Sequence, residues 1–283
     1  DGGVTKINLW ADRSGNGNNL SQANTAKMPH YKAAVGGMIK HPSLAFGPLL
    51  AVEGTHLSGS LPDTITNSPS ITVVVAAFSS QPTAGRLIHF GASSGAAGQV
   101  MSLGQDSSFN YNNGSLVFDG SFMGGLHVGA FRRNSPTKHS DGDFFKNGTS
   151  INGTAINGNN ALNIPSSESL ETLVGAGRGT DGALSDFFSG YMLEIIVVDR
   201  ALDDWNIRRL EGYLAHKWNP NGGATFPDAH PFRSSPPTFG GTQTILFDDN
   251  QSLALNETKM PQAYATSGLP LALVSSNPSI IKV

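Results

Sequence analysis

The residues best suited to bind a cation lie in one short loop near the start of the chain. Asp12 is followed by Asn16, Asn18 and Asn19, with two glycines spaced among them. Such a loop can wrap a calcium ion with carboxylate, amide and backbone oxygens. Asn and Gly also build tight left-handed turns without any ion. The sequence therefore offers Asp12, Asn16 and Asn18 as ligands of a structural calcium ion, with a purely conformational role as the alternative.

A second set of residues has the chemistry of a sugar-binding site. Sugars need aromatic faces that stack on their C–H groups and planar polar side chains that bond to their hydroxyls. The turn-rich segment Phe109–Asn113 offers both, and polar residues occur near other expected loops, where arginines would also suit carboxylated or sulfated glycans. The predicted carbohydrate-binding residues are Tyr111, Asn112, His127, Arg132, His139, Arg178 and Asp181, and the alternative for each is a solvated loop position.

Catalytic motifs are poorly supported. Gly91–Gly95 matches the nucleophile elbow Gly-x-Ser-x-Gly, but the residues after it predict a strand where the elbow requires a helix. Glycosidases of a β-sandwich place two carboxylates two residues apart on one strand face, whereas Glu194 and Asp199 are on opposite faces. The eight histidines lack zinc-binding spacing, and cysteine is absent. We therefore expect no catalysis by this segment, with an unrecognised polysaccharide lyase or hydrolase as the least favoured alternative.

Composition excludes other classes of protein. With 283 residues and a net charge of −3, the chain lacks the basic footprint of a nucleic-acid-binding protein. Its longest apolar runs, such as Ile71–Phe78, are far shorter than the roughly 20 residues that cross a bilayer. Charged residues make up 14%, against about 25% in ordinary globular chains. This composition is typical of secreted β-proteins with long surface loops, so we expect an extracellular, secreted or cell-surface location.

Short strand-like runs fill most of the first 200 residues. They recur roughly every 8 to 15 residues, with turn dipeptides such as Asn147-Gly148 between them, which predicts antiparallel pairing. One helix is expected after the N-cap Asp203, with an apolar face of Ile207, Leu210, Leu214 and Trp218. We expect Trp10 and Trp218 to be packing residues, whereas Trp205 lies off the apolar face of the helix.

Several segments resemble a known family. Leu9–Asn19 resembles the opening signature of laminin-G-like jelly-roll domains, which have the concanavalin A-like lectin/glucanase fold. Phe188–Leu202, Leu210–Trp218 and His230–Phe232 are similar to the end of such domains in large secreted bacterial proteins. The resemblance covers residues 1 to 233 and implies an all-β, antiparallel jelly-roll β-sandwich with one short C-terminal helix.

The rest of the chain predicts a linker and a partial second domain. The prolines after residue 227 are too frequent for a helix or a central strand. We place a Pro/Gly-rich linker at 234–243 and the N-terminal part of an immunoglobulin-like domain at 244–283, because Ala265–Pro270 and Ser275–Ile280 look like the first half of a bacterial immunoglobulin-like repeat. Such a domain needs about 100 residues, so further domains of the same chain are expected.

The favoured function is a non-catalytic glycan-binding module of a large extracellular bacterial protein. Its expected partner is a polysaccharide or a cell-surface glycan, with no nucleic acid and no membrane span. The alternative is a structural or adhesive segment of a cell-surface protein. Both interpretations follow from the resemblance of the fold, and a fold does not determine a function.

Overall fold

The structure is a computed structural model that divides into two compact units, Asp1–Pro236 and Pro237–Val283. It describes residues 5–34, 39, 41–47, 54–66, 70–79, 85–92, 99–104, 108–111, 114–118, 125–134, 142–156, 170–179, 181–219, 222–239, 245–247 and 263–265. Only the backbone is described for the strands between 99 and 118 and for residues 154–156, 222, 245–247 and 263–265. In the second unit, β19 (Ile245–Phe247) and β20 (Ala263–Ala265) pair antiparallel. Most of 244–283 lies outside the described residues, so the immunoglobulin-like domain stays a prediction.

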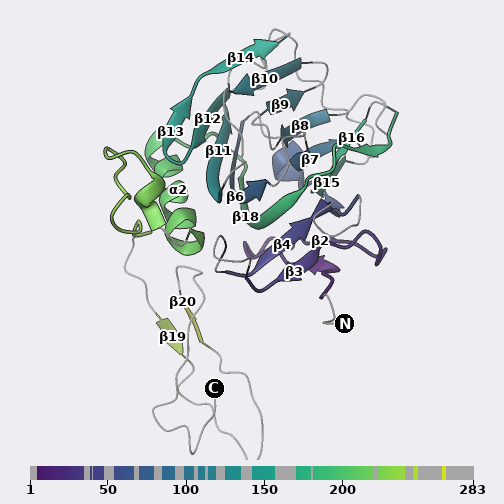
Figure 1. The fold of residues 1–283 in the computed structure, drawn as a ribbon, viewed down its shortest axis with the longest axis horizontal. Helices are drawn as coiled ribbons and strands as arrows, with labels where there is room; N and C mark the ends of the chain where they lie inside the picture. Colours follow the sequence, from purple (N-terminus) through teal and green to yellow (C-terminus); the bar gives the residue numbers. More distant parts are fainter. Residues whose placement is uncertain are drawn as a thin grey trace, which may run out of the picture. The chain divides into compact units, whose positions relative to one another are not determined.

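The larger sheet of the first unit has nine strands (Figure 1). In spatial order these are β1 (Leu9–Trp10), β2 (Leu20–Ser21), β5 (Leu57–Ser60), β15 (Leu170–Val174), β7 (Arg86–Ala92), β8 (Gln99–Gly104), β9 (Ser108–Tyr111), β10 (Gly114–Phe118) and β14 (Gly153–Ile156). Every neighbouring pair is antiparallel. Neighbours in the sheet are often distant in the sequence, since β7 lies between β8 and β15.

The second sheet of this unit has seven strands, again all antiparallel. Their order is β13 (Thr149–Ile151), β12 (Gly142–Lys146), β11 (His127–Arg133), β6 (Ile71–Ser79), β18 (Gly190–Val198), β4 (Ser43–Phe46) and β3 (His30–Lys32). A two-stranded ribbon, β16 (Gly177–Arg178) and β17 (Leu184–Ser185), lies beside β7. The first unit is therefore an all-β antiparallel sandwich, as predicted.

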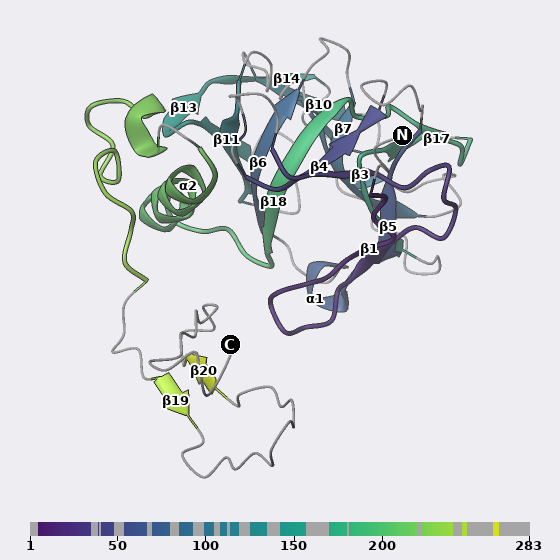
Figure 2. The same cartoon turned by 60° about the horizontal axis from the view of Figure 1, so that its bottom comes forward.

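Strand β6, in the middle of the seven-stranded sheet, is buried on both faces. Val73 and Val75 of β6 belong to the core between the two sheets, whereas Val74 and Ala76 belong to a second core outside it. This outer face is covered by α2 (Asp204–Trp218), which contributes Ile207 to the second core (Figure 2). Burial on both faces explains why β6 is an unbroken apolar run rather than an alternating one.

Helix α2 begins and packs as the sequence predicts. The side chain of Asp203 accepts a hydrogen bond from the backbone N–H of Asn206 at 2.7 Å, which satisfies one of the free donors of the first turn. Leu214 is fully buried, and Trp218 packs against the same core. Trp205 is 57% exposed.

Two short helices, α1 (Asp63–Thr66) and η2 (Gly222–Thr225), were not predicted. Among the described residues, no helix has the length and apolar character needed to span a membrane.

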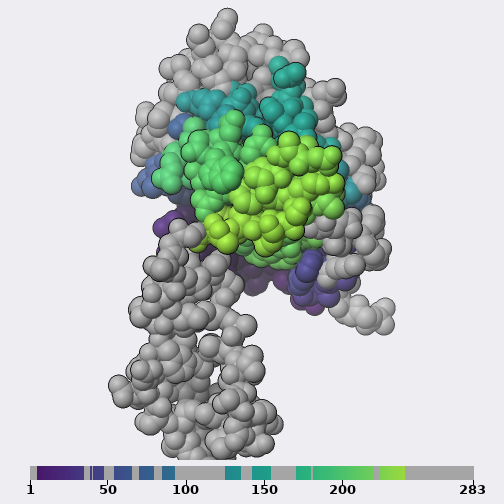
Figure 3. Space-filling model, turned by 90° about the vertical axis from the view of Figure 1, so that its left-hand side faces the viewer, coloured from purple at the N-terminus to yellow at the C-terminus, as the bar shows by residue number. Residues whose placement is uncertain are grey.

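The segment after α2 is fixed to it by buried polar residues. Glu211 is fully buried, and its Oε1 accepts a hydrogen bond from the backbone N–H of Gly148 at 2.9 Å. Its Oε2 lies 3.9 Å from Nε2 of His230, whose ring packs at a tilt against Phe226. Gly148 has a φ of +77°, as the second residue of the Asn147-Gly148 hairpin turn, and a Cβ there would lie 2.4 Å from the His230 ring. Figure 3 looks onto this side of the unit, where α2 and the following segment form one continuous surface.

Candidate functional site

The outer face of the nine-stranded sheet carries His89 near the middle of the sheet. Ile88 and Phe90 of β7 point into the core between the sheets, so His89 between them points outward. Backbone pairing aligns residues from five other strands with it. That cross-strand row is Ser58, Leu173, His89, Ser102, Asn110 and Ser115. Helix α2 packs on the other sheet and so does not cover this face, on which both His89 and Leu173 are 1% exposed.

Two arginine–carboxylate pairs lie around His89. Arg178 of β16 donates from Nε to Oε1 of Glu171 on β15 and from Nη1 to the carbonyl oxygen of Gly182, the latter at 2.6 Å. Arg86 of β7 contacts Oδ2 of Asp186 at 3.1 Å through both Nε and Nη2. The Arg178 and Glu171 side chains are 17% and 15% exposed. Both guanidinium groups are therefore fixed by partners rather than mobile in solvent.

His56 precedes β5 and has partners on both ring nitrogens. Its Nδ1 lies 2.9 Å from the carbonyl oxygen of Gly54, and its Nε2 lies 3.0 Å from Nε2 of Gln22. The only arrangement that fits is an Nδ1–H donor and an Nε2 acceptor, because the carbonyl can only accept and the amide nitrogen can only donate. Burial lowers the pKa of His56, assisted by the charges of Lys27 and Arg178 and opposed by the Gly54 hydrogen bond and Glu171. The ring is therefore neutral at physiological pH.

His89 differs from His56 because neither of its ring nitrogens has a hydrogen-bond partner. The residue is 1% exposed. Burial, assisted by the positive charges of Arg86 and Arg178, lowers its pKa from 6.5 to about 4. His56, Arg86, His89, Glu171, Arg178 and Asp186 are called the His89 cluster below. Apart from Arg178 these residues were not among the predicted site residues, although a lone histidine inside the apolar strand Leu87–Phe90 was a usable signal.

The structure does not bring the seven predicted sugar-binding residues together. Arg178 belongs to the His89 cluster, and Asp181 lies in the adjoining turn, where its Oδ1 accepts from the backbone N–H of Ala183 at 3.0 Å. The backbone of Tyr111 is in β9 of the same sheet. Asn112 and His139 lie outside the described residues. The remaining two, His127 and Arg132, are on β11 of the other sheet.

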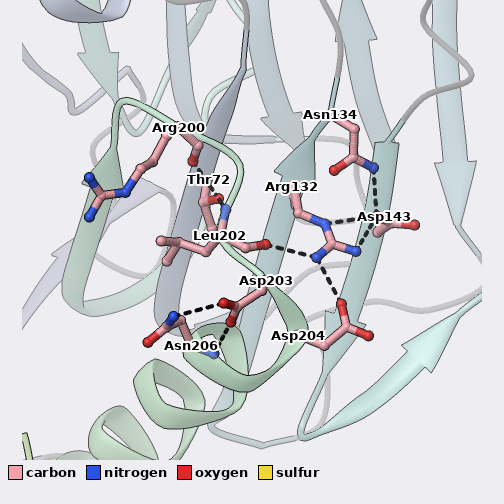
Figure 4. Close-up of polar contacts among 9 residues, drawn as sticks. All are labelled: Thr72, Arg132, Asn134, Asp143, Arg200, Leu202, Asp203, Asp204 and Asn206. Carbon is pink, nitrogen blue, oxygen red and sulfur yellow. Dashed lines mark hydrogen bonds and ion pairs between the residues drawn. The ribbon is translucent and has the colours of Figure 1, made fainter.

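Arg132 connects β11, β12 and the start of α2 (Figure 4). Its Nε and Nη2 donate to Oδ2 of Asp143 at 2.9 and 2.6 Å, and its Nη1 donates to Asp204 Oδ1 and the Leu202 carbonyl at 2.7 and 2.8 Å. Burial alone would lower the pKa of Arg132, but the two carboxylates outweigh it and raise the pKa. All three guanidinium nitrogens are thus engaged within the protein, which is the geometry of a structural residue.

His127 also has a partner inside the fold. Its Nδ1 lies 2.9 Å from Nδ2 of Asn147, the residue with a φ of 48° in the β12–β13 turn. The same asparagine accepts a hydrogen bond from the backbone N–H of Val128 at 2.9 Å. His127 therefore helps to hold the turn that Glu211 contacts from α2.

The Asp12 loop is organised by its own hydrogen bonds. Oδ1 of Asp12 accepts from the Ser14 backbone, and Oδ2 accepts from the Ser14 hydroxyl and the Asn18 backbone, all at 2.8 to 2.9 Å. Desolvation alone would raise the pKa of Asp12, but these bonds outweigh it and lower the pKa. Asn16 donates its backbone N–H to the Ser14 hydroxyl at 3.2 Å. Among the described residues no three His, Asp or Glu side chains gather into a metal-binding group.

This donor set fits the conformational role better than a calcium site. Both carboxylate oxygens of Asp12 face N–H and O–H donors, whereas calcium needs six to eight oxygen ligands aimed at one point. The structural calcium ion at Asp12, Asn16 and Asn18 stays a prediction, and no step below depends on it.

Replacing Asp12 with alanine is expected to lower the free energy of unfolding by about 1 to 2 kcal/mol, because three hydrogen bonds to one carboxylate are lost. Urea unfolding in EDTA and in calcium measures this. Asp228→Ala, at a 97% exposed side chain, is the control and should change little. A loss seen in calcium but absent in EDTA would instead favour the ion.

Comparison with known proteins finds distant similarity of fold. No family model matches the chain, and no curated protein matches it. The NanB sialidase from Streptococcus pneumoniae is 14% identical with a TM-score of 0.36, over 53% of this chain and 25% of that one, so this chain spans about a quarter of its length. Domain 4 of AbnA, an extracellular arabinanase from Geobacillus stearothermophilus solved with arabinotriose, is 14% identical with a TM-score of 0.41, over 74% and 87% of the two chains.

A further solved structure is the CBM40 of the Ruminococcus gnavus IT-sialidase bound to alpha2,3 sialyllactose. It is 13% identical with a TM-score of 0.41, over 60% of this chain and 95% of that one. Because all these scores are below 0.5, the fold assignment rests on the two sheets described above. Membership of the laminin-G-like family stays a prediction.

Proposed function

We propose that this chain is a non-catalytic glycan-binding module and that the His89 cluster is its binding surface. The observation that supports this most is the arrangement of planar polar side chains on the sheet face away from α2. Arg178, Glu171 and His56 are each held by hydrogen bonds, so they keep their orientation before a ligand arrives. Rigid imidazole, guanidinium and carboxylate groups are the partners that sugar hydroxyls require.

The absence of catalysis is part of the proposal. In the His89 cluster, an oxygen of each carboxylate is engaged by an arginine, Glu171 by Arg178 and Asp186 by Arg86. A glycosidase needs one carboxyl group free to donate a proton and another free to attack or activate water. Paired carboxylates support binding better than hydrolysis.

The wider setting in this proposal follows the resemblance to laminin-G-like domains. The module would belong to a large extracellular bacterial protein, secreted or on the cell surface, and would hold it against a polysaccharide or a cell-surface glycan. Further domains of the same chain would carry the activity that this contact serves. A structural calcium ion at Asp12 is compatible with this setting.

Affinity electrophoresis and calorimetry against soluble polysaccharides test the proposal. The panel should contain laminarin, arabinan, xyloglucan, alginate and chondroitin sulfate, with calcium present. We expect at least one to bind the wild-type chain and the Arg178→Gln variant to bind it about tenfold more weakly, the loss of one charge-assisted hydrogen bond. Arg200→Gln is the matched control, because Arg200 is exposed and lies beyond β18 of the other sheet.

Two results would contradict the proposal. A folded wild-type chain that binds no polysaccharide in the panel would overturn the glycan-binding function and leave the structural or adhesive alternative. Release of reducing ends by the isolated chain would overturn the non-catalytic assignment. Circular dichroism of Arg178→Gln must match wild type, since Glu171 loses its partner in this variant.

A further inference from the structure

His89 occupies a position that the folded chain leaves unsatisfied. Both ring nitrogens are buried without a hydrogen-bond partner, at the centre of the nine-stranded sheet. A buried polar group without a hydrogen-bond partner destabilises a fold, and most buried polar groups in proteins have such a partner. Leucine or phenylalanine would fill an outward position on a strand without this cost. An unsatisfied buried group in a native protein calls for an explanation, and a functional role is one of them.

The charges around His89 balance one another. Arg86 is paired with Asp186, and Arg178 is paired with Glu171, so two cations face two anions. His56 is neutral through its bonds to Gly54 and Gln22. Among the described residues, the cation Lys27 also acts on this cluster, through His56. A ligand at His89 therefore meets hydrogen-bonding groups with little net charge.

A neutral imidazole offers one N–H donor and one nitrogen acceptor. A hydroxyl group both donates and accepts, so adjacent sugar hydroxyls complement the two nitrogens, whereas a carboxylate or sulfate can only accept. An anionic group would also leave the acceptor nitrogen of His89 without a donor. The ring therefore favours hydroxyl groups over a carboxylate or sulfate as its direct partners.

We propose that the ligand of the His89 cluster is a neutral sugar, whose hydroxyls supply the two hydrogen-bond partners that His89 lacks in the free protein. This inference rests on the proposed glycan-binding function and specifies its ligand class. Because His89 is 1% exposed, the proposal requires that the groups covering the ring move when the sugar binds.

The decisive variants separate binding from stability. His89→Leu removes both unsatisfied nitrogens and fills the position with an apolar side chain. Its melting temperature at pH 7 should therefore equal or exceed that of wild type. Its affinity for the neutral polysaccharide that wild type binds should fall at least about tenfold. His30→Leu is the matched control, because His30 is also a buried histidine with an unpartnered ring nitrogen, but on β3 of the other sheet. The affinity of His30→Leu for the same polysaccharide should equal that of wild type.

These experiments distinguish failure of the inference about His89 from failure of the proposed glycan-binding function. If wild type binds a neutral polysaccharide and a folded His89→Leu binds it equally well, the inference about His89 is wrong while glycan binding stands. Binding of alginate or chondroitin sulfate alone would overturn the neutral ligand class. Binding of neither type would overturn both proposals. We expect the affinity to be nearly constant from 0.05 to 0.5 M NaCl, because salt screens charge–charge attraction and not hydrogen bonds between neutral groups.

A measurement on the unmodified chain covers the case in which His89→Leu does not fold. Nitrogen-15 NMR resolves the two ring nitrogens of each histidine, and His89→Gln identifies the signals of His89 by their loss. Saturation with an oligosaccharide of the bound polymer should shift both nitrogen signals of His89. Unchanged His89 signals at saturation would overturn the inference.

Discussion

Replacing Arg132 with methionine is expected to lower the free energy of unfolding by about 2 to 3 kcal/mol, the range for losing hydrogen bonds to charged groups in a partly buried ion pair. The side chain of Arg132 is 14% exposed, whereas Asp143 and Asp204 are 38% and 63% exposed. Methionine keeps an apolar side chain but makes no bond to either carboxylate, and it lacks the guanidinium group that lies over the Phe145 ring. The expected loss is below that of a fully buried pair, because water can reach both aspartates.

Urea unfolding of the wild-type chain and the variant measures this effect. Arg200→Met is the control, since Arg200 lies close by in Figure 4 but is exposed, and its change should stay within about 0.5 kcal/mol. Glycan affinity of Arg132→Met should match wild type, because β11 is not part of the nine-stranded sheet. A selective loss of affinity with unchanged stability would contradict the structural role and restore Arg132 as a sugar-binding residue.

Acid is expected to destabilise the wild-type chain through His89 by about 3 kcal/mol between pH 7 and pH 4, which corresponds to a pKa lowered from 6.5 to about 4. Above pH 6.5 His89 is neutral in both the folded and the unfolded chain. As the pH falls from 6.5 to 4, the unfolded chain takes up a proton at His89 and the folded chain does not, so the free energy of unfolding decreases. Below pH 4 both forms are protonated and the loss is complete.

The difference between wild type and His89→Leu isolates this residue from other titrating groups. Urea unfolding at pH 7.5, 5.5 and 4 should show a steeper decline in wild type, with the difference between the two proteins growing by about 3 kcal/mol across this range. His89→Phe should behave as His89→Leu does. Parallel declines in all three proteins would mean that His89 has an ordinary pKa and is reached by water.

Local patterns in the sequence were enough to predict the fold class. Apolar runs separated by Asn147-Gly148 and similar turns indicated antiparallel strands, and the structure gives this dipeptide the left-handed conformations of a hairpin turn. Asp203 and the spacing of Ile207 and Leu214 placed α2 correctly. These features depend on residues within a few positions of one another, so they can be read from the sequence.

The site depended on contacts that the sequence does not reveal. Arg178 and Arg132 look alike as arginines near predicted loops, yet one lies beside β7 of the larger sheet and the other ties β11 to α2. The two arginines lie on different sheets because of the order of strands. In that order Glu171, the partner of Arg178, lies opposite Gly91 of β7. Pairing over such sequence distances reflects the packing of whole sheets, and single residues carry little information about it.

The burial of β6 on both faces has a consequence for how the chain folds. This strand pairs with β11 and with β18, more than a hundred residues later, and its outer face stays uncovered until α2 is present. During synthesis the apolar run Ile71–Phe78 therefore stays partly exposed until residues 190–218 have left the ribosome, because only then can both of its faces be buried. Folding governed by such distant pairing is slow, and it leaves an aggregation-prone segment open in the meantime. Truncation of the gene before α2 would make that exposure permanent.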